Sequence, residues 1–175
     1  MLKPSIKTIT INKLLSFLIL AAFMMTIIMA FTFRALSHHI VQDQITATSE
    51  IIKAGLTSHM KAGIMDKRDY FLNEIKTVHD IDQMVVIRGP AVNRQFGTQQ
   101  LDREINSLAQ KVIQTKLPEF VINDFSITPT IRAVIPYVAS MKGSLNCLGC
   151  HQVQEGTVLG VVDITMDLSR YRAMA

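Results

Sequence analysis

Residues 158–166 read VLGVVDITM, and every second side chain of this run falls on one face of an extended chain. Residues 131–135 read IRAVI and alternate in the same way. Both runs are rich in β-branched side chains, which favour strands. We therefore expect two neighbouring strands near the C-terminal end of the sequence, with the residues between them forming a loop.

A helix and a further strand are expected ahead of this pair. The helix opens with charged residues at 66–69, and its apolar face would be made by Phe71, Ile75 and Val78. The strand is the short apolar run MVVI at residues 84–87, which Gly89-Pro90 ends. Its continuous apolar character predicts a buried strand.

Another helix is expected between this strand and the C-terminal pair. Its apolar side chains recur at helical spacing, with acids early, bases late and Pro118 closing it. The positions are Leu101, Ile105, Leu108 and Val112 on the apolar face, Asp102 and Glu104 early, and Lys111 and Lys116 late. Helices mixed with strands in this order predict an α+β fold rather than a helix bundle.

The segment from Leu14 to Phe33, LLSFLILAAFMMTIIMAFTF, carries no charge. Twenty helical residues at 1.5 Å each cover a hydrocarbon core of about 30 Å, so we expect one transmembrane helix. Lysines precede it, which predicts a cytoplasmic N-terminus and a domain on the other side. In a bacterium this is a single-pass inner-membrane protein with a periplasmic domain. A cleaved signal peptide is the alternative, and it exports the domain as well.

After the membrane segment, Ile45, Ile52, Leu56 and Met60 recur at helical spacing in a stretch without proline. We expect the transmembrane helix to continue as a juxtamembrane helix that ends near Gly63. Its apolar stripe fits packing on the domain's own core and fits a dimer seam. The sequence thus divides into a cytoplasmic N-terminus (1–13), a transmembrane helix (14–33), a juxtamembrane helix (34–65), a sensor-like domain (66–170) and a C-terminal end (171–175).

The net charge of +4 does not predict nucleic-acid binding. Lys3, Lys7 and Lys13 lie in the first 33 residues, where there is no acid. From Arg34 onward, fifteen basic residues face fourteen acidic ones. A nearly neutral domain offers no electrostatic footprint for DNA or RNA.

The two cysteines of the chain fall in Cys147-Leu148-Gly149-Cys150-His151, the C-x-x-C-H pattern of c-type haem attachment. Two thiols at this spacing suit thioether bonds to the vinyl groups of one haem, and the adjacent histidine suits ligation of its iron. Three other interpretations compete: a thioredoxin-like dithiol, a zinc site and a strained disulfide. Export favours haem, because c-type haem is attached outside the bacterial cytoplasm.

Three stretches in this order resemble the periplasmic c-type haem PAS-like sensor domains of bacterial chemoreceptors and related signalling proteins. They are VIRGPAVN (86–93) running to QFG (95–97), IRAVIP (131–136), and CLGCH (147–151) leading to GTVLG (156–160). The resemblance covers about residues 38–168, and C-x-x-C-H is its specific motif. It implies a PAS-like domain with an antiparallel sheet, one covalent haem, a dimer made by exchanging N-terminal helices, and a response to redox state or a small gaseous ligand.

The resemblance makes Cys147 and Cys150 the thioether residues and His151 the proximal iron ligand. In some members a methionine near the N-terminal helix is the sixth ligand, for which Met60 is our candidate. Met65, His59 and water are the alternatives, and a methionine also commonly fills a core. Arg88 and Arg132 are candidates for pairing with the haem propionates, although an arginine at a strand end is often simply solvated.

The chain departs from that family in ending at residues 172–175 without a second membrane helix or an output domain. It would then be a fragment, or a short member that acts through a signalling or electron-transfer partner. We expect a haem sensor that signals through helix packing in a homodimer, or else a membrane-tethered electron-transfer cytochrome. An enzyme is not expected, because the remaining histidines, His38, His39, His59 and His79, fall in no catalytic pattern.

Overall fold

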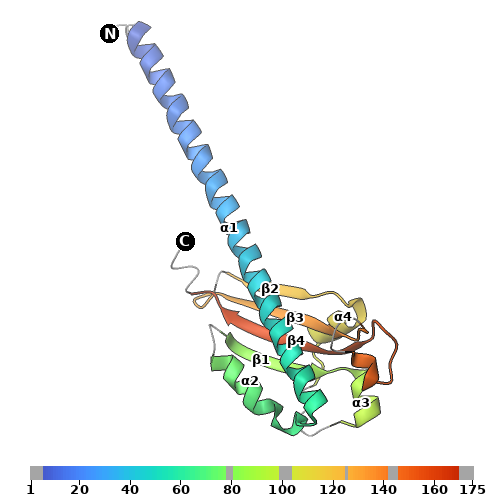
Figure 1. The fold of residues 1–175 in the computed structure, drawn as a ribbon. Coiled ribbons are helices and arrows are strands. Elements are labelled where there is room, and N and C mark those ends of the chain that lie inside the picture. Colours follow the sequence, from blue (N-terminus) through green and yellow to red (C-terminus); the bar gives the residue numbers. More distant parts are fainter. Residues whose placement is uncertain (1–5, 78–80, 99–103, 125, 142–145, 170–175) are drawn as a thin grey trace. The chain divides into compact units, whose positions relative to one another are not determined.

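The structure is a computed structural model that describes residues 6–77, 81–98, 104–124, 126–141 and 146–169. It has an α+β fold with one long N-terminal helix and a four-stranded antiparallel sheet (Figure 1). The elements are α1 (Ile6–Ala62), the 3-10 turn η1 (Met65–Lys67), α2 (Arg68–Thr77), β1 (Ile81–Arg88), α3 (Pro90–Phe96), α4 (Ser107–Thr115), β2 (Glu119–Asn123), β3 (Thr130–Val138), the 3-10 turn η2 (Cys147–Gly149) and β4 (Val158–Asp167).

The chain forms two compact units, residues 1–41 and residues 42–175, and α1 contributes to both. In the first unit, α1 is long and apolar enough to cross a membrane by length and composition, and its most apolar stretch is not buried. The hydroxyl groups of Thr26 and Thr32 donate to carbonyls of the same helix, at 2.9 and 3.0 Å. Such bonds within the helix would satisfy these hydroxyl groups in a lipid environment.

In the second unit, α1 presents a buried stripe at Ile45, Ser49, Ile52 and Leu56. The helix ends at Ala62, and Gly63 follows with a φ of +70°, a conformation that favours glycine. The predicted continuation of the helix and its end near Gly63 are therefore confirmed.

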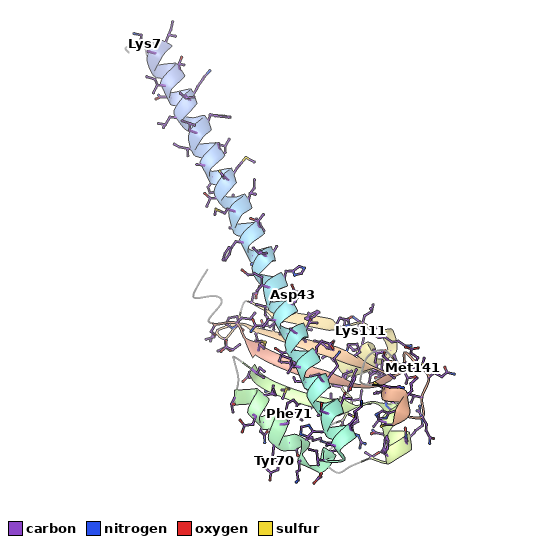
Figure 2. All side chains as sticks on the ribbon, in the orientation of Figure 1. Lys7, Asp43, Tyr70, Phe71, Lys111 and Met141 are labelled. Carbon is purple, nitrogen blue, oxygen red and sulfur yellow. The ribbon has the colours of Figure 1, made fainter. Side chains whose placement is uncertain are left out.

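Close packing between α1 and α2 is made possible by Gly55. A Cβ atom at this position would lie 2.2 Å from Cζ of Phe71, whose ring lies on α2 where the two helices meet (Figure 2). The neighbouring Tyr70 is exposed. Phe71 and Ile75 are half-buried, as their spacing predicts, and Val78 lies outside the described residues.

The sheet has the order β1-β4-β3-β2, and every neighbouring pair is antiparallel. β4 lies between β1 and β3, with Val162 opposite both Val86 and Ile135. All residues of β4 from Val158 to Ile164 are buried. The strands predicted at 84–87, 131–135 and 158–166 are confirmed.

The two faces of the sheet have different coverings (Figure 1). On one face, Val134 and Val161 form an apolar cluster with Ala109 and Val112 of α4. On the other face, the hydroxyl group of Tyr137 on β3 is hydrogen-bonded to that of Thr57 on α1. Alternation along β3 and β4 therefore separates side chains that face α4 from side chains that face α1.

The predicted helix before Pro118 is shorter than expected. It begins at Ser107, because the side chain of Asn106 caps it by accepting the N–H of Ala109 at 2.9 Å. Ile105 precedes the helix and is largely exposed, so its assignment to the apolar face was wrong. Leu101 and Asp102 lie outside the described residues, and Glu104 lies before the helix.

Two elements were not predicted. Helix α3 begins directly after Gly89 with Pro90 at its first position, where proline is common. From the sequence, Gly89-Pro90 was expected only to end a strand, so the helix was missed. Strand β2 has only five residues and pairs with β3 alone. Both are short, and β2 lies at an edge of the sheet, where sequence patterns are weakest.

Candidate functional site

The C-x-x-C-H motif lies in the loop between β3 and β4, as predicted. The side chain of Asn146 accepts the N–H of Leu148 at 3.0 Å and caps a single 3-10 turn over Cys147–Gly149. The carbonyl oxygen of Cys147 then accepts the N–H groups of Cys150 and His151, at 3.2 and 2.9 Å. No regular helix follows the motif in the described residues, which distinguishes it from a thioredoxin-like site.

This loop is closed at its base. The N–H of Ala139 donates to the carbonyl oxygen of Thr157 at 2.8 Å, and the N–H of Gly156 donates to the carbonyl oxygen of Ala139 at 2.9 Å. Above that base, Cys147, Leu148 and Val153 pack against a small core, whose members are Val92, Ala139 and Leu159. The motif is therefore held on α3 and β4 rather than projecting into solvent.

Helix α3 also touches the motif with polar and aromatic side chains. Nε2 of Gln95 donates to the carbonyl of Cys150 at 2.9 Å, and Oε1 of Gln95 accepts the N–H of Gln152 at 2.9 Å. The ring of Phe96 meets the ring of His151 edge-on, with centroids 5.4 Å apart. Residues on either side of His151 are thus fixed by the same helix.

His151 is buried, with 8% of its surface exposed. Its Nδ1 atom is buried and makes no hydrogen bond within the described residues. Burial, and after it the positive charge of Arg88, lower the pKa of the imidazole. The ring is therefore neutral at neutral pH, which is the protonation state in which histidine binds a metal.

A cavity of about 900 Å³ lies beside His151, within the second unit. It is bounded by the C-terminal end of α1, by α2, by β1 and by β4, and Phe96 of α3 closes it near the motif. The residues from the sequence predictions that line it are Met60, Met65, Arg88, Cys150 and His151. Three separate regions of the sequence, at residues 60–65, 88 and 150–151, therefore bring candidate residues to one cavity.

Two predicted residues lie elsewhere. Nδ1 of His59 is hydrogen-bonded to the carbonyl oxygen of Gly55 at 2.8 Å, and its ring contacts Phe71 at a tilt of 39°, with centroids 5.3 Å apart. His59 does not line the cavity. Arg132 extends to the α4 side of the sheet, where its Nε and Nη2 atoms donate to the carboxylate of Asp163 at 2.9 and 2.6 Å. Arg132 borders a separate, smaller pocket and not the cavity.

Cys147 and Cys150 are not joined by a disulfide. Cys150 is exposed and lines the cavity, whereas Cys147 is half-buried against the small core. Within the residues described, no three His, Cys, Asp or Glu side chains gather as a metal site would need. The described part of the chain therefore offers no zinc site of the usual four-ligand kind.

Several residues at the cavity were not predicted. Arg68 and Lys76 bring positive charge from α2, and Asp69 beside Arg68 brings negative charge. Tyr137 of β3 lines the cavity and is hydrogen-bonded to Thr57 of α1. Gln95 holds the motif from α3. Gln95 belongs to the QFG stretch of the resemblance, but no sequence pattern gave these residues a role at the site, which only the tertiary arrangement shows.

Comparison of the chain with protein-family models finds no match, and a search of curated proteins finds none either. The function therefore has to be inferred from the site itself.

Proposed function

We propose that the chain is a membrane-anchored c-type haem sensor with a PAS-like domain in the bacterial periplasm. It would respond to redox state or to a small gaseous ligand, and it would signal through helix packing in a homodimer. The observation that carries this proposal is the meeting of Cys150 and His151 with Met60 and Arg88 at one cavity. Met60, Arg88 and the C-x-x-C-H motif are far apart in the sequence, so the fold brings them together.

The residues at the cavity fit a haem. The volume of about 900 Å³ lies within the range of about 300–1,000 Å³ that small-molecule and cofactor sites occupy. Apolar side chains of β1 and β4 would contact the porphyrin, and positive side chains at the cavity suit its two carboxylates. Cys147 and Cys150 would hold it covalently, and the neutral imidazole of His151 would bind its iron.

When bound, the haem would supply an iron that changes oxidation state and binds small diatomic ligands. Side chains that line the cavity would control access of small ligands to that iron. Met60 and Met65 line the cavity and are the candidates for the sixth position. Arg88 and Lys76 would favour the charged form of the propionates, whereas Asp66 and Asp69 at the same cavity would oppose it. Arg88 is also bonded to the carbonyl of Gly97 at 3.3 Å.

The connection to the membrane segment supports a sensor. Met60 lies in the last turn of α1, and α1 is one uninterrupted helix that also carries the apolar stretch from Leu14 to Phe33. Thr57 ties α1 to Tyr137 at the edge of the cavity. A change at the iron that altered the packing of Met60 or Tyr137 would therefore act directly on α1. Exposed apolar side chains on α1, such as Ile51, are available to a partner helix.

Electron transfer is the second candidate function. It is favoured by the exposure of Cys150, because a porphyrin bonded there would have an edge near the surface. An exposed edge lets a partner protein exchange electrons without any conformational change. A permanently six-coordinate iron would support this function, whereas a site open to ligands would support the sensor.

The test is a visible absorption spectrum of the full chain, expressed with a haem-maturation system and purified in detergent. Covalent haem should survive denaturation in the wild type, and its amount should fall sharply in Cys147→Ser and Cys150→Ser. His151→Ala should keep the thioethers and lose the normal iron ligation. Arg132→Gln is the matched control, because Arg132 lies away from the cavity.

A wild-type chain without covalent haem would exclude the proposal. Carbon monoxide binding by the reduced form would favour the sensor over the electron carrier.

A further inference from the structure

The side-chain amide of Gln95 bonds the main chain on both sides of His151. Its Nε2 atom donates to the carbonyl oxygen of Cys150, and its Oε1 atom accepts the N–H of Gln152, each at 2.9 Å. Cys150 and Gln152 are the residues immediately before and after His151. One side chain therefore fixes both peptide groups that determine where the imidazole projects.

At neutral pH, the carboxamide of glutamine supplies the donor and the acceptor that this pair of bonds needs, and a carboxylate or a thioether of similar length does not. The carbonyl of Cys150 requires a donor and the N–H of Gln152 requires an acceptor, and both must come from one planar group. A glutamate in place of Gln95 would retain the acceptor and lose the donor. A methionine, which has similar length, would lose both hydrogen bonds.

Gln95 is itself mounted on a short helix that is fixed at both ends. At the start of α3, the N–H of Gly89 donates to the carbonyl of Leu159 on β4 at 2.7 Å. At the other end, Nη1 of Arg88 donates to the carbonyl of Gly97 at 3.3 Å. The adjacent Phe96 contacts the imidazole of His151 edge-on. Helix α3 thus contacts His151 at its ring and at both of its neighbours.

We propose that Gln95 is a positioning residue that sets the orientation of the His151 imidazole toward the iron. This inference rests on the proposed function, because it requires His151 to be the iron ligand. The Nδ1 atom of His151 has no hydrogen-bond partner in the described residues, so no bond to the ring itself fixes its direction. The orientation of the imidazole is instead set by the main chain that Gln95 holds and by the ring of Phe96. Without Gln95, the imidazole would adopt a range of orientations.

The first measurement does not depend on haem. In the full chain, purified in detergent, hydrogen exchange at the amide of Gln152 should accelerate about tenfold in Gln95→Met, the change expected when one hydrogen bond is lost. Gln95→Glu keeps the acceptor for this amide and should remain close to wild type. Gln154→Met is the matched control, because Gln154 lies exposed in the same loop. Unchanged exchange in Gln95→Met would overturn the proposal.

The second measurement uses the same variants with haem attached. Electron paramagnetic resonance of the oxidised wild type and of Gln154→Met should show one iron species, whereas Gln95→Met should show broadened or additional signals and a shifted midpoint potential. Gln95→Glu should lie between them. Identical spectra and potentials in all variants would refute the role of Gln95 and leave the haem proposal intact. A wild-type chain that carries no haem would instead overturn both.

Discussion

Tyr137 lies where the cavity meets α1, and its surroundings disfavour its ionised form. Burial raises the pKa of the phenol, and the hydrogen bond with Thr57 opposes part of that rise. In the unfolded chain the group ionises near pH 10. The contribution of Tyr137 to stability is thus fully present below about pH 10, and it is lost as the pH rises through the folded-state pKa.

We therefore expect one tyrosine to titrate late. In an alkaline titration followed by tyrosinate absorbance, the wild-type chain should show a delayed phase that Tyr137→Phe removes. Tyr70 is exposed, so Tyr70→Phe should retain the delayed phase. Coincident delayed phases in the wild type and in Tyr137→Phe would show that the buried phenol is not perturbed.

The pair of Arg132 and Asp163 should contribute to stability and not to haem chemistry. Asp163 is nearly buried, and after loss of Arg132 its carboxylate would keep a hydrogen bond from Nδ2 of Asn106, at 3.4 Å. Arg132 is partly exposed and can regain water when Asp163 is lost. We expect Arg132→Ala to lower the unfolding free energy by about 2 kcal/mol and Asp163→Ala by about 1 kcal/mol.

Urea unfolding followed by circular dichroism would measure this difference. The visible spectrum and midpoint potential of folded Arg132→Ala should equal those of the wild type, because the pair faces α4 and not the cavity. A shifted potential in Arg132→Ala would place the arginine near the haem after all.

Site residues could be predicted from the sequence only where they belong to a motif or to a periodic apolar pattern. The spacing of Cys147, Cys150 and His151 identifies a candidate haem site directly. Met60 could be proposed because it lies on a recognisable helix face just before Gly63. Arg132 could not be distinguished from Arg88, because both lie on strands, and only the fold shows which face each side chain reaches. Gln95 lies in the QFG stretch that contributes to the resemblance, but nothing in the sequence shows that its side chain contacts the residues beside His151.

Close approach of the main chains of β1 and β4 explains why glycine is required at position 160. A Cβ atom there would lie 2.5 Å from the carbonyl oxygen of Ile87, and a main-chain atom cannot move aside as a side chain can. Gly160 also pairs with Arg88 and lines the cavity. We expect Gly160→Ala to separate β1 from β4 and to lower the unfolding free energy by about 2 kcal/mol or more.

Gly149 provides the matched control for this substitution. A Cβ atom at Gly149 would meet no other atom within 4 Å. Chemical denaturation should therefore show Gly149→Ala within about 0.5 kcal/mol of the wild type. Equal stability of the two alanine variants would contradict the close approach at Gly160.

The helices and strands were predictable to different extents for physical reasons. Strands β3 and β4 have long apolar runs, and their tertiary environment agrees with that local pattern. The apolar spacing before Pro118 continued to Leu101 in the sequence, but the Asn106 side chain caps α4 and starts it later. Helix α3 has seven residues, too few to establish a helical period.

The proposed topology makes a further prediction for the intact protein. If the lysines before Leu14 stay in the cytoplasm, a reporter fused after residue 175 should lie in the periplasm. A C-terminal alkaline phosphatase fusion should therefore be active in cells, whereas a cytoplasm-dependent fluorescent reporter exported by the same route should not mature. The opposite pair of results would reverse the topology and remove the compartment in which c-type haem is attached.

The place of β4 in the sheet has a consequence for how the protein is made. β4 follows the C-x-x-C-H motif in the sequence, yet it is the strand that joins β1 to β3. If synthesis and export proceed from the N-terminus, the motif crosses the membrane before the strand that completes the sheet. The enzymes that attach haem would then meet the cysteines on a chain that has not folded. The arrival of β4 would close the domain around a cofactor already in place, so biogenesis would proceed in a fixed order: export, attachment, folding.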